Sequence, residues 1–161
     1  MKFSRSNHIL TVAIMFGLLI MIIVSIIAGI VLRELSFSVA LANPELQHLR
    51  VPVLLIGLVL ISIFIINLIL AEILLGRIIM NSIFTESNVR LLKSISWLFI
   101  VGILPLATLY LLTALNVNGS ITQIYVILFG IVYLTAGLIF RFWANLIRDA
   151  SQFKQEVDMT V

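Results

Sequence analysis

Apolar residues dominate four long stretches of the chain, at about residues 9–32, 51–75, 95–115 and 121–143, with short polar segments between them. Each stretch has about 20 residues or more, and an α-helix of that length crosses a bilayer hydrocarbon core of about 30 Å. The pattern therefore predicts an all-α integral membrane protein, a bundle of four transmembrane helices.

Composition is typical of a single membrane domain over residues 1–161. Hydrophobic residues make up 62% of the chain and the mean hydropathy is +1.25, far outside the range of soluble domains. The absence of cysteine excludes disulfides and thiolate nucleophiles. The two histidines, His8 and His48, fall on opposite sides of the predicted membrane and cannot share a metal ion. We therefore expect no cofactor and no metal.

Catalytic patterns are missing from the polar remainder of the sequence. It contains no glycine-rich phosphate loop, no Ser-x-x-Lys pair and no clustered carboxylates. Catalysis within the membrane would need a nucleophile with a base beside it at depth. The sequence therefore predicts that the protein is not an enzyme.

Lysine and arginine are distributed unequally between the two sides of the predicted membrane. Eight of the ten lie in the N-terminal segment, the second loop or the C-terminal part, and two, Arg33 and Arg50, lie in the first loop. Lysine and arginine residues that lie close to the membrane in short loops stay on the cytoplasmic side. Both termini are therefore predicted to be cytoplasmic. The formal net charge of +3 is then explained by this topology and implies a modest attraction to anionic lipid. We expect no direct binding to nucleic acid.

Small residues indicate where the helices meet, because helices in lipid associate where side chains allow close backbone approach. Gly17, Ser25 and Gly29 follow four-residue steps in the first span and are expected on one packed face. Gly130 and Gly137 recur after seven residues in the fourth span.

Two prolines are expected to shape the helices. Pro105, deep in the third span, removes a backbone donor and predicts a kink. In the first loop, Asn43 and Pro44 are typical of the start of a short helix that leads into the second span.

One ionisable residue within the spans needs an explanation, namely Glu72 near the predicted cytoplasmic end of the second span. A charge costs about 3 kcal/mol or more at the bilayer centre and less toward the interface, and it usually marks a pair or a pathway. Arg141 should lie at a similar depth in the fourth span, so Glu72 and Arg141 are a candidate intramembrane polar pair. A proton or cation pathway through Glu72, Asn67 and the kink at Pro105 is the alternative.

The predicted cytoplasmic segments carry the most specific patterns. A polar turn at 81–88 supplies capping residues before the third span. In the tail at 144–161, an apolar residue recurs after four, three and four residues, at Leu146, Ala150, Phe153 and Val157, which places an apolar stripe on a short helical extension. This stripe can dock on a partner protein, on the preceding loop or on the membrane surface, and a frayed tail is the alternative.

Two short motifs in these segments resemble a known family. Members have a Phe-Thr-x-x-Asn turn before the third span and a tail similar to Glu-x-Asp-Leu-Thr-Val. The matching residues, which are also the candidate docking residues together with Phe153, are Phe84, Thr85, Asn88, Glu156, Asp158 and Thr160. The chain resembles a bacterial four-helix membrane protein family called domain of unknown function 2975. It departs from the family at Ile83, where proline is frequent, and at Met159, where leucine is usual.

The resemblance implies a multi-pass protein of the bacterial cytoplasmic membrane, often encoded beside a small helix-turn-helix regulator, and it implies no activity. Our first hypothesis is a non-enzymatic regulatory or sensing module that acts through such a cytosolic partner. One alternative is a small transporter or ion-pathway protein that forms a homo-oligomer. Another is a subunit or assembly factor of a membrane complex. All three place the chain in contact with the lipid bilayer.

Overall fold

The computed structural model describes residues 5–80, 85–117 and 120–159 of the chain. In chain order the elements are the helices α1 (Arg5–Ala42), the 3-10 helix η1 (Pro44–Leu49), α2 (Arg50–Ile79), α3 (Glu86–Val101), α4 (Ile103–Asn116) and α5 (Ile121–Met159). The described residues contain no strand. Four helical stretches are long and apolar enough to cross a membrane, which confirms the all-α membrane fold and its four spans.

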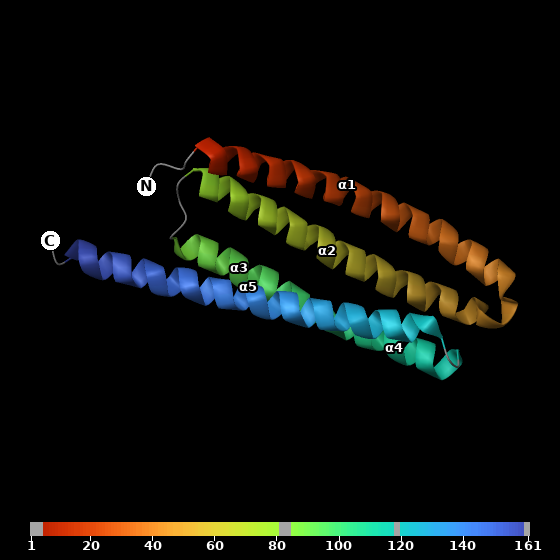
Figure 1. The fold of residues 1–161 in the computed structure, drawn as a ribbon. Coiled ribbons are helices and arrows are strands. Elements are labelled where there is room, and N and C mark those ends of the chain that lie inside the picture. The colour runs from red at the N-terminus through yellow and green to blue at the C-terminus, as the bar shows by residue number, and fades with distance from the viewer. Residues whose placement is uncertain (1–4, 81–84, 118–119, 160–161) are drawn as a thin grey trace.

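The helices run side by side along one direction (Figure 1). The start of α1 and the end of α5 lie at the same end of the molecule, which we call the terminal end. The 3-10 helix η1 and the connection from α4 to α5 lie at the opposite end, which we call the loop end. This up-and-down order agrees with the four predicted spans, since an even number of crossings returns the chain to the side where it began.

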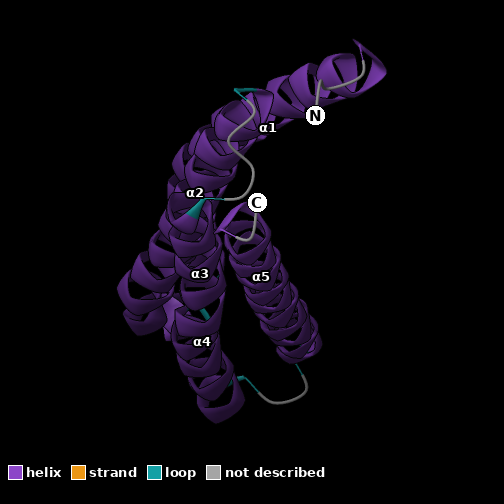
Figure 2. Ribbon diagram, turned by 90° about the vertical axis from the view of Figure 1, so that its left-hand side faces the viewer, coloured by secondary structure: helices purple, strands orange, loops and turns teal. Residues whose placement is uncertain are grey.

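The helices form an open row in which α1 and α5 lie far apart (Figure 2). α1 packs mainly on α2, α2 also contacts α3 and α4, and α5 packs along α3 and α4. α1 therefore lies at one edge of the bundle. Most of its apolar side chains are exposed in the described structure, as expected for a helix that contacts lipid on several sides.

A narrow seam joins α1 to α2. The least exposed residues of α1 recur at steps of three and four, and they are Thr11, Met15, Leu18, Ile22, Ser25, Gly29, Leu32, Ser36 and Ala40. This spacing is that of a coiled-coil contact. Gly29 meets Leu58 of α2, where a Cβ atom on the glycine would lie 3.8 Å from Cδ2. Gly17 has nothing within 4 Å of such an atom, so its predicted place in the packed face is wrong.

The third span consists of two helices with a break between them. α3 ends at Val101 and α4 begins at Ile103, with Gly102 between them. Pro105 has no N–H to donate to the carbonyl of Val101, four residues earlier, so the regular hydrogen-bond ladder is interrupted there. The N–H of Gly102 still donates to the carbonyl of Leu98 at 2.9 Å. The third span is therefore interrupted about one turn before Pro105, the proline from which a kink was predicted.

The tightest packing joins α3 to α5. Leu92 is 1% exposed and Ala144 is fully buried. The hydroxyl of Ser96 donates to the carbonyl of Gly137 at 2.8 Å. A Cβ atom on Gly137 would lie 3.0 Å from Cγ1 of Ile100 and 3.3 Å from the carbonyl oxygen of Ser96. The backbones therefore approach closely at Gly137, as predicted, whereas Gly130 has nothing within 4 Å.

Aromatic rings extend the contact between α3 and α5 in both directions from Gly137. Phe99 meets Tyr133 edge to face with ring centroids 5.4 Å apart, and it stacks on Phe140 at 5.8 Å. Phe140 in turn meets Trp143 edge to face at 5.7 Å. Such pairs contribute about 0.5–1.5 kcal/mol each beyond the area they bury, and the two pairs made by Phe99 join α3 to α5.

Candidate functional site

The structure describes the polar turn at 81–88 from Thr85 into the first residues of α3, and this part lies at the terminal end. Thr85 has an extended backbone, with φ −125° and ψ 145°, and its carbonyl accepts hydrogen bonds from the N–H groups of Asn88 and Val89. The predicted helix start is therefore confirmed. The guanidinium of Arg77 at the end of α2 donates to the hydroxyl of Ser87, which ties α2 to the first turn of α3. Phe84 lies outside the described residues.

Asn88 lies inside the protein rather than on its surface. Its side chain is 1% exposed. It lines a cavity of about 260 Å³ where α2, α3 and α5 meet, and the other lining residues are Leu74, Leu75, Ile78, Leu92, Trp143, Leu146 and Ile147. A partner protein cannot reach Asn88 in this structure, so we correct its assignment as a docking residue. Asparagine is common in exposed turns, and nothing in the sequence shows that the first turn of α3 presents this side chain to two other helices.

α5 continues without a break beyond its apolar part and ends at Met159, which confirms a helical extension after the fourth span. Phe153 is 68% exposed and Leu146 is 50% exposed. These two residues are seven positions apart and share a face of the helix. Glu156 and Asp158 belong to the same helix, but their side chains lie outside the described part, as does Thr160.

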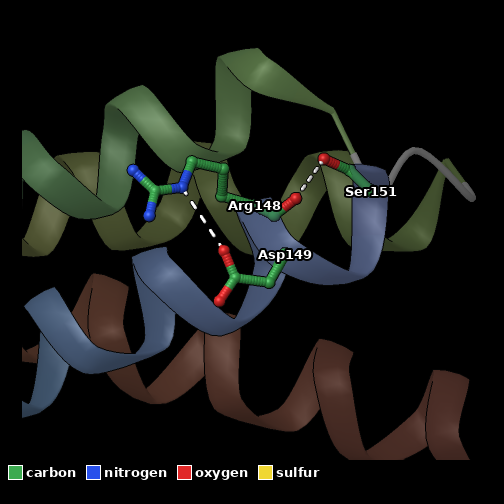
Figure 3. A network of polar contacts seen from close by, with 3 residues as sticks. All are labelled: Arg148, Asp149 and Ser151. Carbon is green, nitrogen blue, oxygen red and sulfur yellow. Dashed lines mark hydrogen bonds and ion pairs between the residues drawn. The ribbon is translucent and has the colours of Figure 1, made fainter. Parts of the chain in front are cut away.

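Polar contacts on the extension are local to one turn of α5 (Figure 3). Nε of Arg148 lies 3.5 Å from Oδ1 of Asp149, and the hydroxyl of Ser151 donates to the carbonyl of Arg148 at 2.7 Å. Both charged side chains are about half exposed. An exposed ion pair contributes at most about 1 kcal/mol, so little free energy is lost when these side chains leave each other. Both can therefore contact other groups at the surface of the extension.

The predicted pair of Glu72 and Arg141 does not form. Glu72 is half-buried on α2, Arg141 is exposed on α5, and no ion pair joins them in the described structure. α2 and α5 both pack against α3 and α4. Similar depth in the membrane does not bring the two side chains together, because depth says nothing about the direction in which each side chain lies around its helix axis.

Asn67 is the most unusual polar residue within the second span. It is 4% exposed, and neither its amide nitrogen nor its amide oxygen has a hydrogen-bond partner. A polar group without a partner in hydrocarbon costs several kcal/mol. Asn67 therefore offers one donor group and one acceptor inside the bundle.

A cavity of about 400 Å³ lies at the loop end. Its walls come from α1, η1, α2, α4 and the connection to α5, and they are mostly aliphatic. Arg50 is the one charged residue among the described lining residues. Nε2 of His48 in η1 lies 3.3 Å from Oδ1 of Asn116 at the end of α4, so a polar contact joins the two sides of the cavity.

This cavity was not predicted from the sequence, because Arg50 was used there only to assign the topology. The relevant signal is an arginine at the start of an apolar run, on the side of the membrane that is poor in basic residues. In the described structure, no group of three or more histidine, cysteine or acidic residues is placed to hold a metal ion.

Comparison with protein families shows where the chain belongs. The model of a family described as "Protein of unknown function (DUF2975)" matches residues 35–161, well over half of the chain. The chain belongs to the DUF2975 family. The match begins within α1 and covers both segments from which the resemblance was inferred, so the recognition is confirmed. No curated protein and no solved structure matches this DUF2975 protein.

Proposed function

We propose that this DUF2975 protein is a non-enzymatic regulatory or sensing module of the bacterial cytoplasmic membrane that acts through a cytosolic partner. A small helix-turn-helix regulator is the partner class we would test first. The observation that carries the proposal is the exposed apolar side chain of Phe153 on the extension of α5. In this proposal the terminal end faces the cytoplasm.

The length of α5 supports a projecting helix. Its 39 residues span about 58 Å at about 1.5 Å per residue, against a hydrocarbon core of about 30 Å. A large part of the helix therefore lies beyond the hydrocarbon. An apolar stripe on a helix in water favours a partner groove that covers it. Phe153 and Leu146 are the candidate contacts, because both are exposed and share one face.

The packing of α5 provides a physical link between the bilayer and its extension. α5 is held against α3 by the close approach at Gly137 and by the hydrogen bond from Ser96. α3 is tied to α2 by the contact of Arg77 with Ser87. A change in the spacing of these helices would move the exposed stripe with respect to the membrane, which is the motion a sensing module needs.

Photo-crosslinking in living cells tests the proposal. A photoreactive amino acid at Phe153 in the full-length protein should capture one soluble protein. The same probe at Leu115, which is 81% exposed at the loop end, serves as the control and should not capture it. Adducts formed only with lipid or with a second copy of the chain would contradict a cytosolic partner.

A second placement of the probe makes the result specific to the stripe. A photoreactive residue at Leu146 should capture the same protein, and adding Phe153→Asp should abolish that capture because a charge replaces the apolar contact. Adding Asp149→Ala, at an exposed position on the same extension, should leave the capture intact. Equal loss with both substitutions would indicate general damage to the extension instead of a docking face.

A small transporter or ion-pathway protein is the second candidate, favoured by the unpartnered amide of Asn67. Buried polar groups in spans often mark ion or proton pathways. Protein reconstituted in liposomes should then show proton- or cation-linked flux, and Asn67→Leu should remove the flux while the protein stays folded. Wild-type protein without flux over a broad screen of ions and pH gradients would leave the regulatory module as the better account.

A further inference from the structure

The cavity at the loop end has the size and lining of a ligand site. Its volume of about 400 Å³ falls in the range of about 300–1,000 Å³ that is usual for small-molecule sites. The wall includes Leu32 of α1, Leu54 of α2, Leu109 of α4 and Val117 beyond α4. These side chains suit a hydrocarbon chain, because they offer apolar contact on several sides.

Arg50 adds a positive charge to this apolar wall. Nε of Arg50 donates to the hydroxyl of Ser36 at 3.3 Å, and the guanidinium carbon lies 4.8 Å from the ring centroid of Phe37. Both contacts hold the guanidinium in place, and neither neutralises its charge. No carboxylate forms an ion pair with Arg50 in the described part of the chain. A half-buried cation without an anionic partner attracts an anion from outside the protein.

The position of Arg50 along the chain indicates where this anion lies. Arg50 is the first residue of α2, and the apolar run of the second span begins immediately after it. In a membrane-spanning arrangement the guanidinium then lies at the boundary between headgroups and hydrocarbon, where lipid phosphates are located. A guanidinium group can bind a phosphate with two parallel hydrogen bonds. Arginine therefore suits a phosphate site better than lysine, whose ammonium group acts as a point charge.

We infer that the cavity between α1, α2 and α4 binds an anionic phospholipid, with one acyl chain along the aliphatic wall and the phosphate at Arg50. The lipid enters from the surrounding leaflet, so its local concentration is high. The inference concerns the loop end and does not rest on the proposed cytosolic partner.

Native mass spectrometry of the full-length protein tests this inference. The protein would be released from bilayers that contain phosphatidylglycerol and phosphatidylcholine with the same acyl chains. Wild-type protein should retain phosphatidylglycerol in preference to phosphatidylcholine. Arg50→Gln should lower that retention about tenfold, which corresponds to the loss of a charge-assisted hydrogen bond. Arg33→Gln is the matched control, because Arg33 is exposed on α1 and does not line the cavity.

A second variant keeps the test decisive if Arg50→Gln disturbs folding. Leu54→Trp fills the cavity and leaves Arg50 in place, so it should also reduce phosphatidylglycerol retention while the helical circular dichroism spectrum stays unchanged. Equal retention of the two lipids by the wild-type protein would overturn the inference. So would unchanged phosphatidylglycerol retention in the folded Leu54→Trp protein.

Discussion

Gly137 and Gly130 occupy the same helix seven residues apart, yet only Gly137 lies against another backbone. A methyl group at Gly137 would lie 3.3 Å from the carbonyl oxygen of Ser96, which is fixed in α3, whereas one at Gly130 would meet nothing within 4 Å. We therefore expect Gly137→Ala to lower the free energy of unfolding by about 1–3 kcal/mol, because the helices must move apart. Unfolding in mixed detergent micelles, followed by circular dichroism, measures this change.

Gly130→Ala is the matched control for that prediction. It should be neutral or raise the free energy of unfolding by up to about 1 kcal/mol, because alanine favours the helix more than glycine does. Two variants of equal stability would show that the contact between α3 and α5 is looser than the structure indicates.

Single residues show why the sequence predicted some contacts and missed others. Gly29 contacts α2 as expected, but Gly17 turns away. Four-residue steps drift by about 40° each around a helix of 3.6 residues per turn, so three steps separate Gly17 from Gly29 by about 120°. The observed seam alternates steps of three and four and stays on one side. Asn88 shows a different kind of error. A polar residue in a polar turn was predicted to lie on the surface, but in the structure its side chain is buried.

At the scale of elements, the third span offers a direct test of what breaks the helix between α3 and α4. Pro105→Ala supplies the missing N–H to the carbonyl of Val101. We expect the new amide at position 105 to be protected from hydrogen exchange, measured by mass spectrometry with fragment-level resolution. Pro52→Ala is the control, because Pro52 lies in the first turn of α2 where N–H groups have no partner within the helix. The new amide at position 52 should therefore exchange rapidly.

Fast exchange at position 105 in the Pro105→Ala protein would contradict this explanation. The break would then depend on Gly102 and its contact with the ring of Tyr133, since a Cβ atom on Gly102 would lie 2.6 Å from that ring.

Most elements could be predicted from the sequence, because apolar length alone defines membrane spans. The short helix after Asn43 was predicted from its proline and is found as η1. The far end of α5 was harder to place, since it depends on a stripe of only a few residues. The separation of α3 from α4 follows from Pro105, but the turn at which the chain breaks depends on local packing at Gly102.

At the scale of the whole molecule, the order of the helices decides which side chains meet. Apolar runs give the depth of each residue in the membrane but not its direction around the helix axis. Glu72 and Arg141 were therefore predicted to pair from depth alone. In the structure both of their helices pack against α3 and α4, yet no ion pair joins these two side chains. The cavity at Arg50 is likewise formed by several elements together, and it could not be predicted from any one of them.

The orientation of the terminal end is the central claim of the functional account, because a cytosolic partner can reach Phe153 only from the cytoplasm. The chain has no cysteine, so Gln47→Cys and Phe153→Cys each introduce a single label site at opposite ends of the molecule. Spheroplasts would be treated with a membrane-impermeant maleimide before and after permeabilisation. We expect the Gln47→Cys protein to react in intact spheroplasts and the Phe153→Cys protein to react only after permeabilisation. Labelling of the Phe153→Cys protein in intact spheroplasts would contradict the account.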